Sequence, residues 1–443
     1  MRPPRLWHPA QVVVTGFAAA LVVGTLLLLI PAASTGIGGA GLLDALFTAT
    51  SAICVTGLTT VDTPVYWTTF GHVVILALMQ IGGIGIMALA TLLGLLVSRR
   101  LGLRMRLNTT AETKSLALGD VRRVLIGVAR TSLAFEAAGG AILAARFATH
   151  DEPLGRAVWL GVFHAVSAFN NAGFTLFSDS LVGFADDPFI TGAVCVLVIA
   201  GGLGFPVLFE LHREWRAPRR WSLHTKIVMS MSAALLAVGT VMFWTLEWTN
   251  PQTLGRMSFV EKVGAGLFQS VQPRSAGFST VNTGDLTPET LLGWDVLMFI
   301  GGGSAGTAGG IKVTTFAVLL FVIVAEIRGD RSASGFNRRI PLEAQRQALT
   351  VALLAVATVF GSVGLMLLVT PFALEHVLFE VISALATAGL STGITAEVGT
   401  AGQLLLIVLM FLGRLGPITL ASALALRSRP RMYDLPQERP IIG

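Results

Sequence analysis

Four copies of one short segment recur at nearly equal spacing along the 443-residue chain. Each copy ends in a glycine followed by a bulky apolar residue, and the four glycines lie 116, 104 and 112 positions apart, at Gly57, Gly173, Gly277 and Gly389. Each glycine follows an apolar run that begins ten residues earlier, at Phe47, Phe163, Leu267 and Phe379. Such a repeat predicts four equivalent quarters arranged around one centre.

A second glycine-rich motif follows each copy, 24 to 28 residues further on and inside a long apolar stretch. In the third quarter this motif interrupts a stretch that is otherwise continuous. The four motifs occupy 81–85, 200–204, 300–304 and 412–416. The repeats divide the chain into quarters at 1–98, 99–212, 213–327 and 328–426, with a tail at 427–443.

The composition predicts an all-α polytopic membrane protein. The chain is 53% hydrophobic and only 13% charged, whereas a soluble domain carries about 25% charged residues. Apolar stretches of about 20 residues, long enough to cross a hydrocarbon core of about 30 Å, recur throughout. Each quarter is predicted to contribute a span, a short pore helix, a glycine-ended loop and a second span, around a central pore of pseudo-four-fold symmetry. The eight predicted transmembrane helices cover 12–30, 68–98, 124–147, 188–211, 225–248, 291–325, 347–369 and 402–426.

The net charge of +6 follows membrane topology and does not indicate a nucleic-acid partner. Most of the basic residues, 23 of the 31 lysines and arginines, fall in the termini and in the links between quarters. Cytoplasmic segments carry such an excess. We therefore expect a multi-pass protein of the plasma (inner) membrane with both termini in the cytoplasm. The basic links are suited to anionic lipid or to a docked partner. These segments are 1–11, 99–123, 213–226, 328–346 and 427–443.

The short apolar runs are too short to cross a membrane and predict re-entrant half-helices. They cover 42–54, 158–170, 258–271 and 375–386. Non-helical backbone at membrane depth is tolerated only inside protein or along a cavity, so the glycine-ended loops are expected to line one. Backbone carbonyls there would replace the hydration shell of a monovalent cation, and the negative helix ends would favour it. The alternative is four ordinary extracellular loops.

These residues carry a resemblance to a known family. The fourfold pattern resembles the Trk/Ktr/HKT superfamily of potassium transporters. The segments 167–174 (SAFNNAGF) and 301–312 (GGGSAGTAGGIK) are similar to KtrB-type membrane subunits in particular. The resemblance covers nearly the whole chain. It implies K⁺ uptake through one pore per protomer, a homodimer, and gating by a cytosolic KtrA-like ring subunit that binds nucleotide (ATP/ADP or NAD(H)). It also implies stimulation by Na⁺, and no cofactor bound by this chain.

The resemblance places a selectivity filter for K⁺ in the four loops. Glycine at the first position, Gly57, favours K⁺ over Na⁺ by the same resemblance. The third quarter departs from the pattern, because Val271 stands where the others have serine and Arg274 adjoins the loop. We expect Arg274 to point away toward an outer carboxylate such as Asp285. The implied filter residues are Val55, Thr56, Gly57, Asn171, Ala172, Gly173, Ser275, Ala276, Gly277, Thr387, Ala388 and Gly389.

A gate is expected below the filter. The segment 303–310 has four glycines and no large side chain, so it is a poor helix, and broken helices in membranes mark functional sites. By resemblance it is an intramembrane loop that blocks the pore. The alternatives are a close helix–helix contact of small residues and a phosphate-binding loop, which no strand precedes. The gate residues are Gly303, Ser304, Ala305, Gly306, Thr307, Ala308, Gly309, Gly310, Lys312 and Arg414.

Arg414 replaces a glycine of the second motif and lies within a span. An arginine there is costly and faces the protein interior or water. It would repel cations or hold the 303–310 segment closed by hydrogen bonds; alternatively, it pairs with a carboxylate such as Glu136. Lys312 would cap the same segment or extend to the lipid surface.

Three other functions compete with a gated K⁺ pore. A Na⁺- or H⁺-coupled secondary transporter with inverted repeats would alternate repeat orientation, whereas every quarter here has two spans and one orientation. A Na⁺-permeable member of the same superfamily stays open. An intramembrane enzyme would need a nucleophile and a base within the spans, which hold few ionisable residues, so we expect no enzyme activity.

Overall fold

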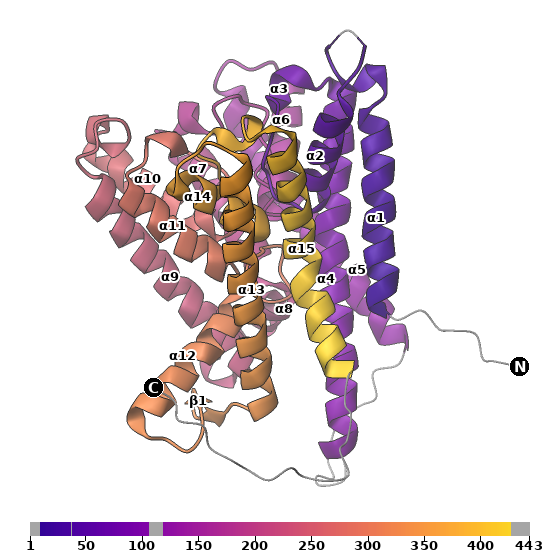
Figure 1. Cartoon of the computed structure of the whole chain (residues 1–443), viewed down its shortest axis with the longest axis vertical. Coiled ribbons are helices and arrows are strands. Elements are labelled where there is room, and N and C mark those ends of the chain that lie inside the picture. Colours follow the sequence, from indigo (N-terminus) through magenta and orange to yellow (C-terminus); the bar gives the residue numbers. More distant parts are fainter. Residues whose placement is uncertain (1–8, 37, 106–117, 427–443) are drawn as a thin grey trace, which may run out of the picture.

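The computed structural model describes residues 9–36, 38–105 and 118–426. Within these ranges the fold is helical apart from one small hairpin of β1 (Ser334–Gly335) and β2 (Arg338–Arg339). The long helices stand side by side, and the hairpin lies at one end of the molecule (Figure 1). The family resemblance also predicts that the tail at 427–443 folds back into a dimer interface, and this tail lies outside the described residues.

In each quarter the first, long helix is followed by a shorter one. The first has α1 (Pro9–Leu28), α2 (Leu42–Ile53), α3 (Thr63–Tyr66) and α4 (Thr69–Met105). The second has α5 (Leu118–Ala148), α6 (Leu154–Phe169), α7 (Pro188–Leu203) and α8 (Phe205–Glu214). The third has α9 (Leu223–Glu247), α10 (Phe259–Val271), α11 (Pro288–Ile300) and α12 (Val313–Arg328). The fourth has α13 (Leu342–Val369), α14 (Leu374–Leu385) and α15 (Gly399–Leu426).

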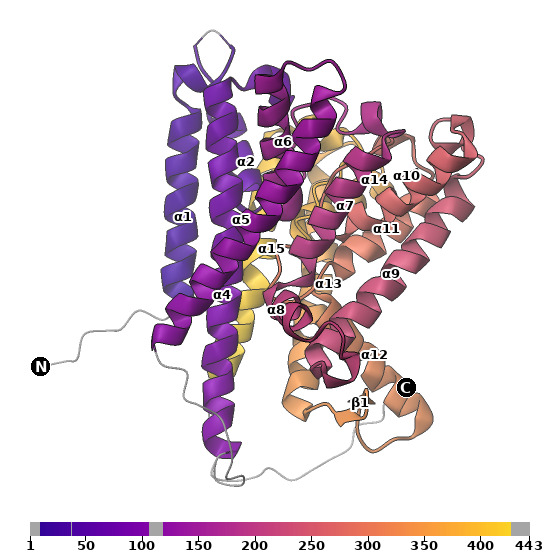
Figure 2. The same ribbon diagram turned by 180° about the vertical axis from the view of Figure 1, so that it is seen from behind.

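The short helices α2, α6, α10 and α14 lie in the half of the molecule away from the hairpin, as Figure 2 shows from behind. Their inward faces are buried: Phe47, Phe163, Phe268 and Phe379 are at most 1% exposed. Local sequence fixes where such a helix begins. Ser258 caps α10 by accepting a hydrogen bond from Glu261 N, and Glu261 Oε2 accepts one from Ser258 N at 2.8 Å. This capping box satisfies two backbone donors that the first turn leaves free.

Five helices among the described residues are long and apolar enough to cross a membrane. A sixth candidate joins α7 and α8, but the pair is bent by 102°. The described apolar part of α1 (Val14–Leu28), α11 and α12 are shorter, so the eight-span layout stays a prediction. The five helices cover Thr69–Met87, Leu125–Ala148, Leu223–Glu247, Leu342–Val369 and Gly399–Gly416.

The bend between α7 and α8 corrects the single straight span expected at 188–211. Gly204 joins the two helices with φ 92°, a left-handed angle that glycine adopts readily. Pro206 follows in the first turn of α8, where its missing N–H costs nothing. The chain therefore turns sharply where apolar composition alone predicted continuation.

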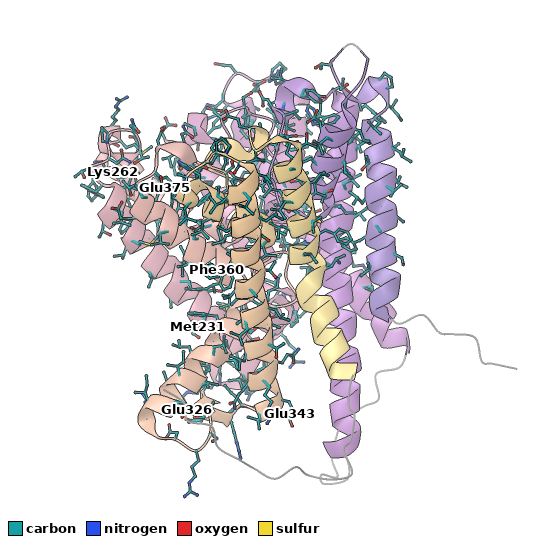
Figure 3. All side chains as sticks on the ribbon, viewed as in Figure 1. Met231, Lys262, Glu326, Glu343, Phe360 and Glu375 are labelled. Atoms are coloured by element: carbon teal, nitrogen blue, oxygen red, sulfur yellow. The ribbon has the colours of Figure 1, made fainter. Side chains whose placement is uncertain are left out.

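The surface agrees with a lipid-facing flank between two polar ends. Phe360 on α13 is 71% exposed and lies midway along the molecule (Figure 3). Lys262 and Glu375 lie toward one end, and Glu326 and Glu343 lie at the end that carries the hairpin (Figure 3). An exposed aromatic at mid-height is normal for a helix that contacts hydrocarbon.

Asp187 lies outside the predicted spans and links α7 to α5 by hydrogen bonds. Its carboxylate accepts hydrogen bonds from Arg146 Nε at 2.7 Å, from His150 Nε2 at 2.9 Å and from the backbone of Phe189 and Ile190 at the start of α7. Burial acts to raise the pKa of this carboxyl, but the hydrogen bonds from His150, Arg146 and the helix N-terminus hold it below its ordinary value.

Replacing Asp187 by alanine should destabilise the protein. Loss of the helix cap alone should cost about 0.5–2 kcal/mol of unfolding free energy, measured by thermal unfolding in detergent. Because the folded-state pKa is depressed, the contribution exists above an ordinary aspartate pKa of about 3.9 and disappears as the pH falls through the lower folded value. Asp186→Ala, at the exposed neighbour, is the control; equal stability of both variants near neutral pH would contradict the assignment.

Candidate functional site

The four glycine-ended loops share one backbone conformation. The glycines have positive φ, and so does the residue two positions before each of them. The glycines are Gly57 (φ 96°), Gly173 (71°), Gly277 (76°) and Gly389 (85°). The preceding residues are Val55 (55°), Asn171 (57°), Ser275 (90°) and Thr387 (48°). A β-branched residue such as Val55 or Thr387 rarely adopts this angle, and such strain concentrates at functional sites.

The four glycines form a closed ring. A Cβ atom placed on Gly57 would lie 2.5 Å from Ala172 O, one on Gly173 would lie 2.7 Å from Ala276 O, and one on Gly277 would lie 2.8 Å from Ala388 O. The circle closes because a Cβ on Gly389 would collide with Thr56 O. Each loop thus packs its glycine against the carbonyl of the next loop in chain order.

Each loop is tied to the end of its pore helix by an equivalent backbone hydrogen bond. The N–H before the glycine donates to a carbonyl five residues back in three quarters: Thr56 to Ser51 (2.8 Å), Ala172 to Ser167 (2.7 Å) and Ala388 to Ser383 (2.8 Å). In the third quarter Ala276 N donates to Gln272 O, four residues back, at 3.0 Å. Gln272, not Val271, therefore occupies the position of the three serines, and that part of the sequence alignment was wrong by one residue.

The same shift appears one turn earlier in α10. Leu267, expected beside Phe47, is 53% exposed, whereas Phe268 is 1% exposed and takes the buried position. The third quarter has one residue fewer between this phenylalanine and the glycine. Pro273 explains the difference, because α10 ends at Val271 and passes into a 3₁₀ turn at Gln272–Arg274, and proline lacks the N–H that would continue the helix.

Arg274 does not reach Asp285, so that expectation was wrong. Its guanidinium donates to Ser232 Oγ at 2.9 Å and Ser232 O at 3.3 Å, and to Gly301 O at 3.4 Å. Asp285 instead accepts from Asn282 Nδ2. The charge is directed toward α9 and the end of α11, where carbonyl acceptors satisfy it.

A polar cavity of about 440 Å³ opens on the side where the four loops continue beyond their glycines. We call it the vestibule. The four ring glycines line its floor, and Ser279 and Ser391 lie in its wall. The charged residues of its lining, Asp62 and Asp179, are both acidic. Such a lining raises the local concentration of cations.

On the opposite side of the ring, the segment 301–312 runs between α11 and α12 beneath the loops. Gly303 N donates to Gly202 O at 2.8 Å, and Gly309 N donates to Ser275 Oγ at 2.6 Å. Thr307 N donates to Gly201 O at 3.1 Å. Any Cβ on Gly303 or Gly309 would collide with backbone oxygens. The segment therefore contacts the third loop and α7 directly, and only glycine fits at positions 303 and 309.

Arg414 and Lys312 both donate to carbonyls of this segment. Arg414 on α15 is 4% exposed, and its Nη1 donates to Thr307 O. Lys312 Nζ donates to Ala308 O, which favours a cap over extension into lipid. The pairing of Arg414 with Glu136 is not observed. Glu136 accepts instead from Gln80 Nε2 at 2.8 and 3.0 Å and from Asn170 Nδ2 at 3.2 Å.

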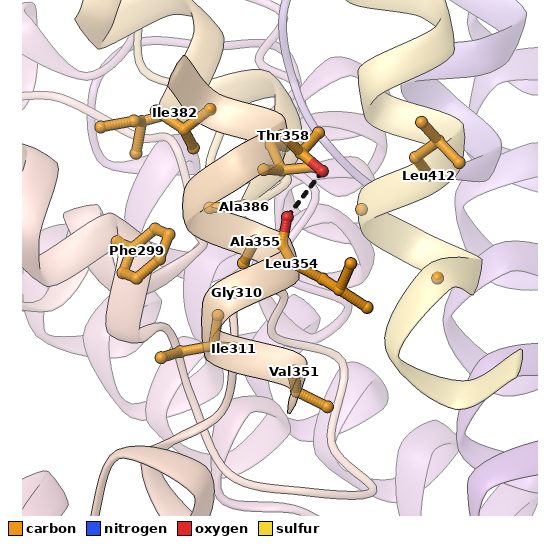
Figure 4. Close-up of a pocket in the computed structure, with 14 residues that line it drawn as sticks. Phe299, Gly310, Ile311, Val351, Leu354, Ala355, Thr358, Ile382, Ala386 and Leu412 are labelled. Carbon is orange, nitrogen blue, oxygen red and sulfur yellow. Dashed lines mark hydrogen bonds between the residues drawn. The ribbon is translucent and has the colours of Figure 1, made fainter. Parts of the chain in front are cut away.

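Behind the segment lies an apolar cavity of about 280 Å³, bordered by α13, α14 and α15 (Figure 4). Gly310 and Ile311 of the segment, Ala386 at the end of α14 and Gly413 beside Arg414 line it. The end of α14, the segment and α15 thus meet around one largely apolar space, and the hydroxyl of Thr358 in its lining donates to Leu354 O at 2.8 Å.

Sequence reasoning did not predict the contacts of several polar side chains in and beside the short helices. Half-buried Gln80 on α4 and buried Asn170 at the end of α6 join Glu136 of α5 in one cluster. Buried His164 bonds Leu160 O at 2.8 Å, and Glu380 is fully buried. A signal existed: Thr48, His164 and Glu380 stand at the same distance before their glycines.

Residues 2–430 match the family model TrkH, described as a cation transport protein. The Ktr system potassium uptake protein B of Bacillus subtilis (strain 168) is 37% identical over 417 residues, 94% of this chain and 93% of that protein. Its namesake in Vibrio alginolyticus is 37% identical over 434 residues, 98% of this chain and 94% of that protein.

One further relative and one solved structure are also similar to this chain. The potassium/sodium uptake protein NtpJ of Enterococcus hirae is 34% identical, over 98% of this chain and 97% of its own length. The crystal structure of the potassium transporter TrkH from Vibrio parahaemolyticus has the same fold, with a TM-score of 0.72 over 95% of this chain and 86% of that one at 18% identity. With its matched family model, its relatives and its fold, the chain belongs to the TrkH family of cation transport proteins.

Proposed function

We propose that this protein carries K⁺ across the plasma membrane through the ring of four glycine-ended loops. The observation that carries the proposal is the ring itself, in which each glycine packs against the carbonyl of the next loop. Backbone carbonyls gathered at membrane depth supply oxygen ligands for a desolvated monovalent cation. Relatives named as potassium uptake proteins support K⁺ as the ion.

The electrostatics of the ring favour a cation. The pore helices α2, α6 and α14 end at Ile53, Phe169 and Leu385, each two residues before the loop residue of left-handed φ. Each helix C-terminus carries roughly half a negative charge. With acidic Asp62 and Asp179 in the vestibule, the ion would meet negative potential from the mouth to the ring.

The gate we propose is the segment 303–310 with Lys312 and Arg414. It lies against the ring on the side away from the vestibule, and Arg414 binds its Thr307 carbonyl. A buried positive charge there both holds the segment in place and repels a cation leaving the ring. Opening would require these contacts to break.

The wider assembly belongs to the same proposal. The names of the relatives as Ktr system proteins support a membrane subunit that works with other components. We propose that the partner is a KtrA-like ring that binds nucleotide, and that the membrane subunit forms a homodimer. The basic link between α8 and α9 and the hairpin with Arg338 and Arg339 fit a cytoplasmic end. In this arrangement α1, α7 with α8, and α11 with α12 complete eight spans in four quarters, and no cofactor is required.

Replacing Gly173 by alanine should abolish most transport. The new Cβ would meet Ala276 O at 2.7 Å, and φ 71° is unfavourable for alanine. We expect uptake of ⁸⁶Rb⁺ into liposomes to fall about tenfold or more, since strain and displaced carbonyls each cost on the order of 1–3 kcal/mol. Gly155→Ala, in the same quarter with open space around it, is the control.

The same assay tests the alternatives. A uniporting pore takes up ⁸⁶Rb⁺ without an imposed Na⁺ or pH gradient, whereas a coupled transporter depends on one. Excess Na⁺ that competes equally with Rb⁺ would favour a Na⁺-permeable member, as the name of NtpJ suggests for that relative. Parent-like uptake by Gly173→Ala would contradict the assignment of the ring as the filter.

Removing Arg414 should open the pore. Arg414→Ala loses the bond to Thr307 O and the buried charge, and deletion of 304–309 removes the obstruction. We expect ⁸⁶Rb⁺ flux without a cytosolic partner to rise several-fold, roughly the effect of 1 kcal/mol on a gating equilibrium. The matched control is Arg130→Ala, at an exposed position of α5. Flux equal to the parent in both gate variants would show that the segment is not the gate.

A further inference from the structure

A side chain of pore helix α14 holds the chain that leaves the fourth loop. Glu380 is fully buried. Its Oε1 accepts from Ser391 Oγ and from Thr392 N, the latter at 3.2 Å, and its Oε2 accepts from Thr395 Oγ1 at 3.0 Å. The carboxyl group therefore anchors three of the six residues that follow Gly389.

The second and third quarters contain the same tether. In the second, His164 Nε2 accepts from Leu176 N at 3.3 Å. In the third, the Gln269 side-chain oxygen, in the amide orientation that satisfies its neighbours, accepts from Thr280 N at 3.0 Å. Leu176 and Thr280 each lie three residues after their ring glycine, as Thr392 does in the fourth quarter.

In the first quarter a side chain at a different position of the short helix holds the equivalent residue. Thr48 stands at the position of Glu380, but its buried hydroxyl has no hydrogen-bond partner among the described residues. Asp44, one turn earlier on α2, accepts from Thr60 Oγ1 at 3.1 Å, and Thr60 is again three residues after the glycine. All four quarters therefore tether one equivalent residue, by four different side chains.

The tether acts on the ring by fixing the chain that follows each ring glycine. Each ring glycine lies between two anchors: the backbone bond from the preceding residue to the pore helix, and the tether three residues beyond. Ser279 and Ser391, within the tethered segments, also line the vestibule. A loop held at both ends keeps its carbonyls at a fixed separation, and a filter that cannot contract discriminates between cations of different radius.

We propose that Asp44, His164, Gln269 and Glu380 are positioning residues that set the ion selectivity of the ring, and that Glu380 contributes most because its carboxyl group accepts three hydrogen bonds. This inference rests on the proposed function. It names the residues, outside the loops themselves, that determine which monovalent cation the loops accept.

The test measures initial uptake of ⁸⁶Rb⁺ and ²²Na⁺ into liposomes by the full-length protein. We expect Glu380→Ala to lower the Rb⁺/Na⁺ ratio about tenfold, because it removes three buried hydrogen bonds at once. Glu380→Gln keeps an acceptor for Ser391 and Thr392 and should recover most of the lost ratio. The isosteric Thr395→Val removes the hydroxyl that contacts Glu380 Oε2 and Ser391 Oγ, while two of the three bonds to Glu380 remain, and it should lower the ratio about threefold.

The control is Glu375→Gln, which changes the same functional group at a half-exposed position of the same helix. If the parent takes up ⁸⁶Rb⁺ selectively and a folded Glu380→Ala variant keeps the parental Rb⁺/Na⁺ uptake ratio, the inference is wrong. The proposed function would still hold. If Glu380→Ala does not fold, a folded Thr395→Val variant that keeps the parental Rb⁺/Na⁺ uptake ratio overturns the inference instead. Absence of ⁸⁶Rb⁺ uptake by the parent would instead contradict the proposed function.

Discussion

Backbone packed against backbone at the ring of glycines is the constraint on which the rest of the structure depends. Each glycine Cα lies so close to the carbonyl of the next loop that a single added methyl group would collide with it. The pore helices must therefore end at the same depth, and the residue two before each glycine must take a left-handed angle, even where it is Val55 or Thr387. Side chains of the pore helices then hold the chain on the far side of the ring.

Three departures from fourfold symmetry lie in the third quarter and are physically connected. Pro273 shortens the approach to the third loop by one residue, and the segment 301–312 breaks the following helix. Arg274 joins these two irregular features, because its guanidinium donates both to Ser232 on α9 and to Gly301 O at the start of the segment. A chain that is symmetric at the ring is thus asymmetric directly beneath it, where the segment contacts Ser275 and Arg414.

Much of the local structure could be predicted from the sequence. The short helix expected at 42–54 is Leu42–Ile53, and the one expected at 375–386 is Leu374–Leu385, since apolar periodicity and turn residues mark both ends. The family resemblance was confirmed by the matched model and relatives. Periodicity was insensitive to a one-residue shift, so Leu267 was aligned in place of Phe268. It also predicted a straight span through Gly204, because apolar composition does not reveal a left-handed turn.

The sequence by itself determined the four glycine-ended segments, their spacing and the membrane character, because these depend on residue spacing and on the cost of burying polar groups in hydrocarbon. Only the tertiary structure decided which atoms meet. It placed Arg414 on Thr307 O instead of Glu136, turned Arg274 away from Asp285, and brought Glu380 to the chain beyond Gly389. These pairings join residues from different helices or loops, and their partners depend on how helices pack, which no local pattern encodes.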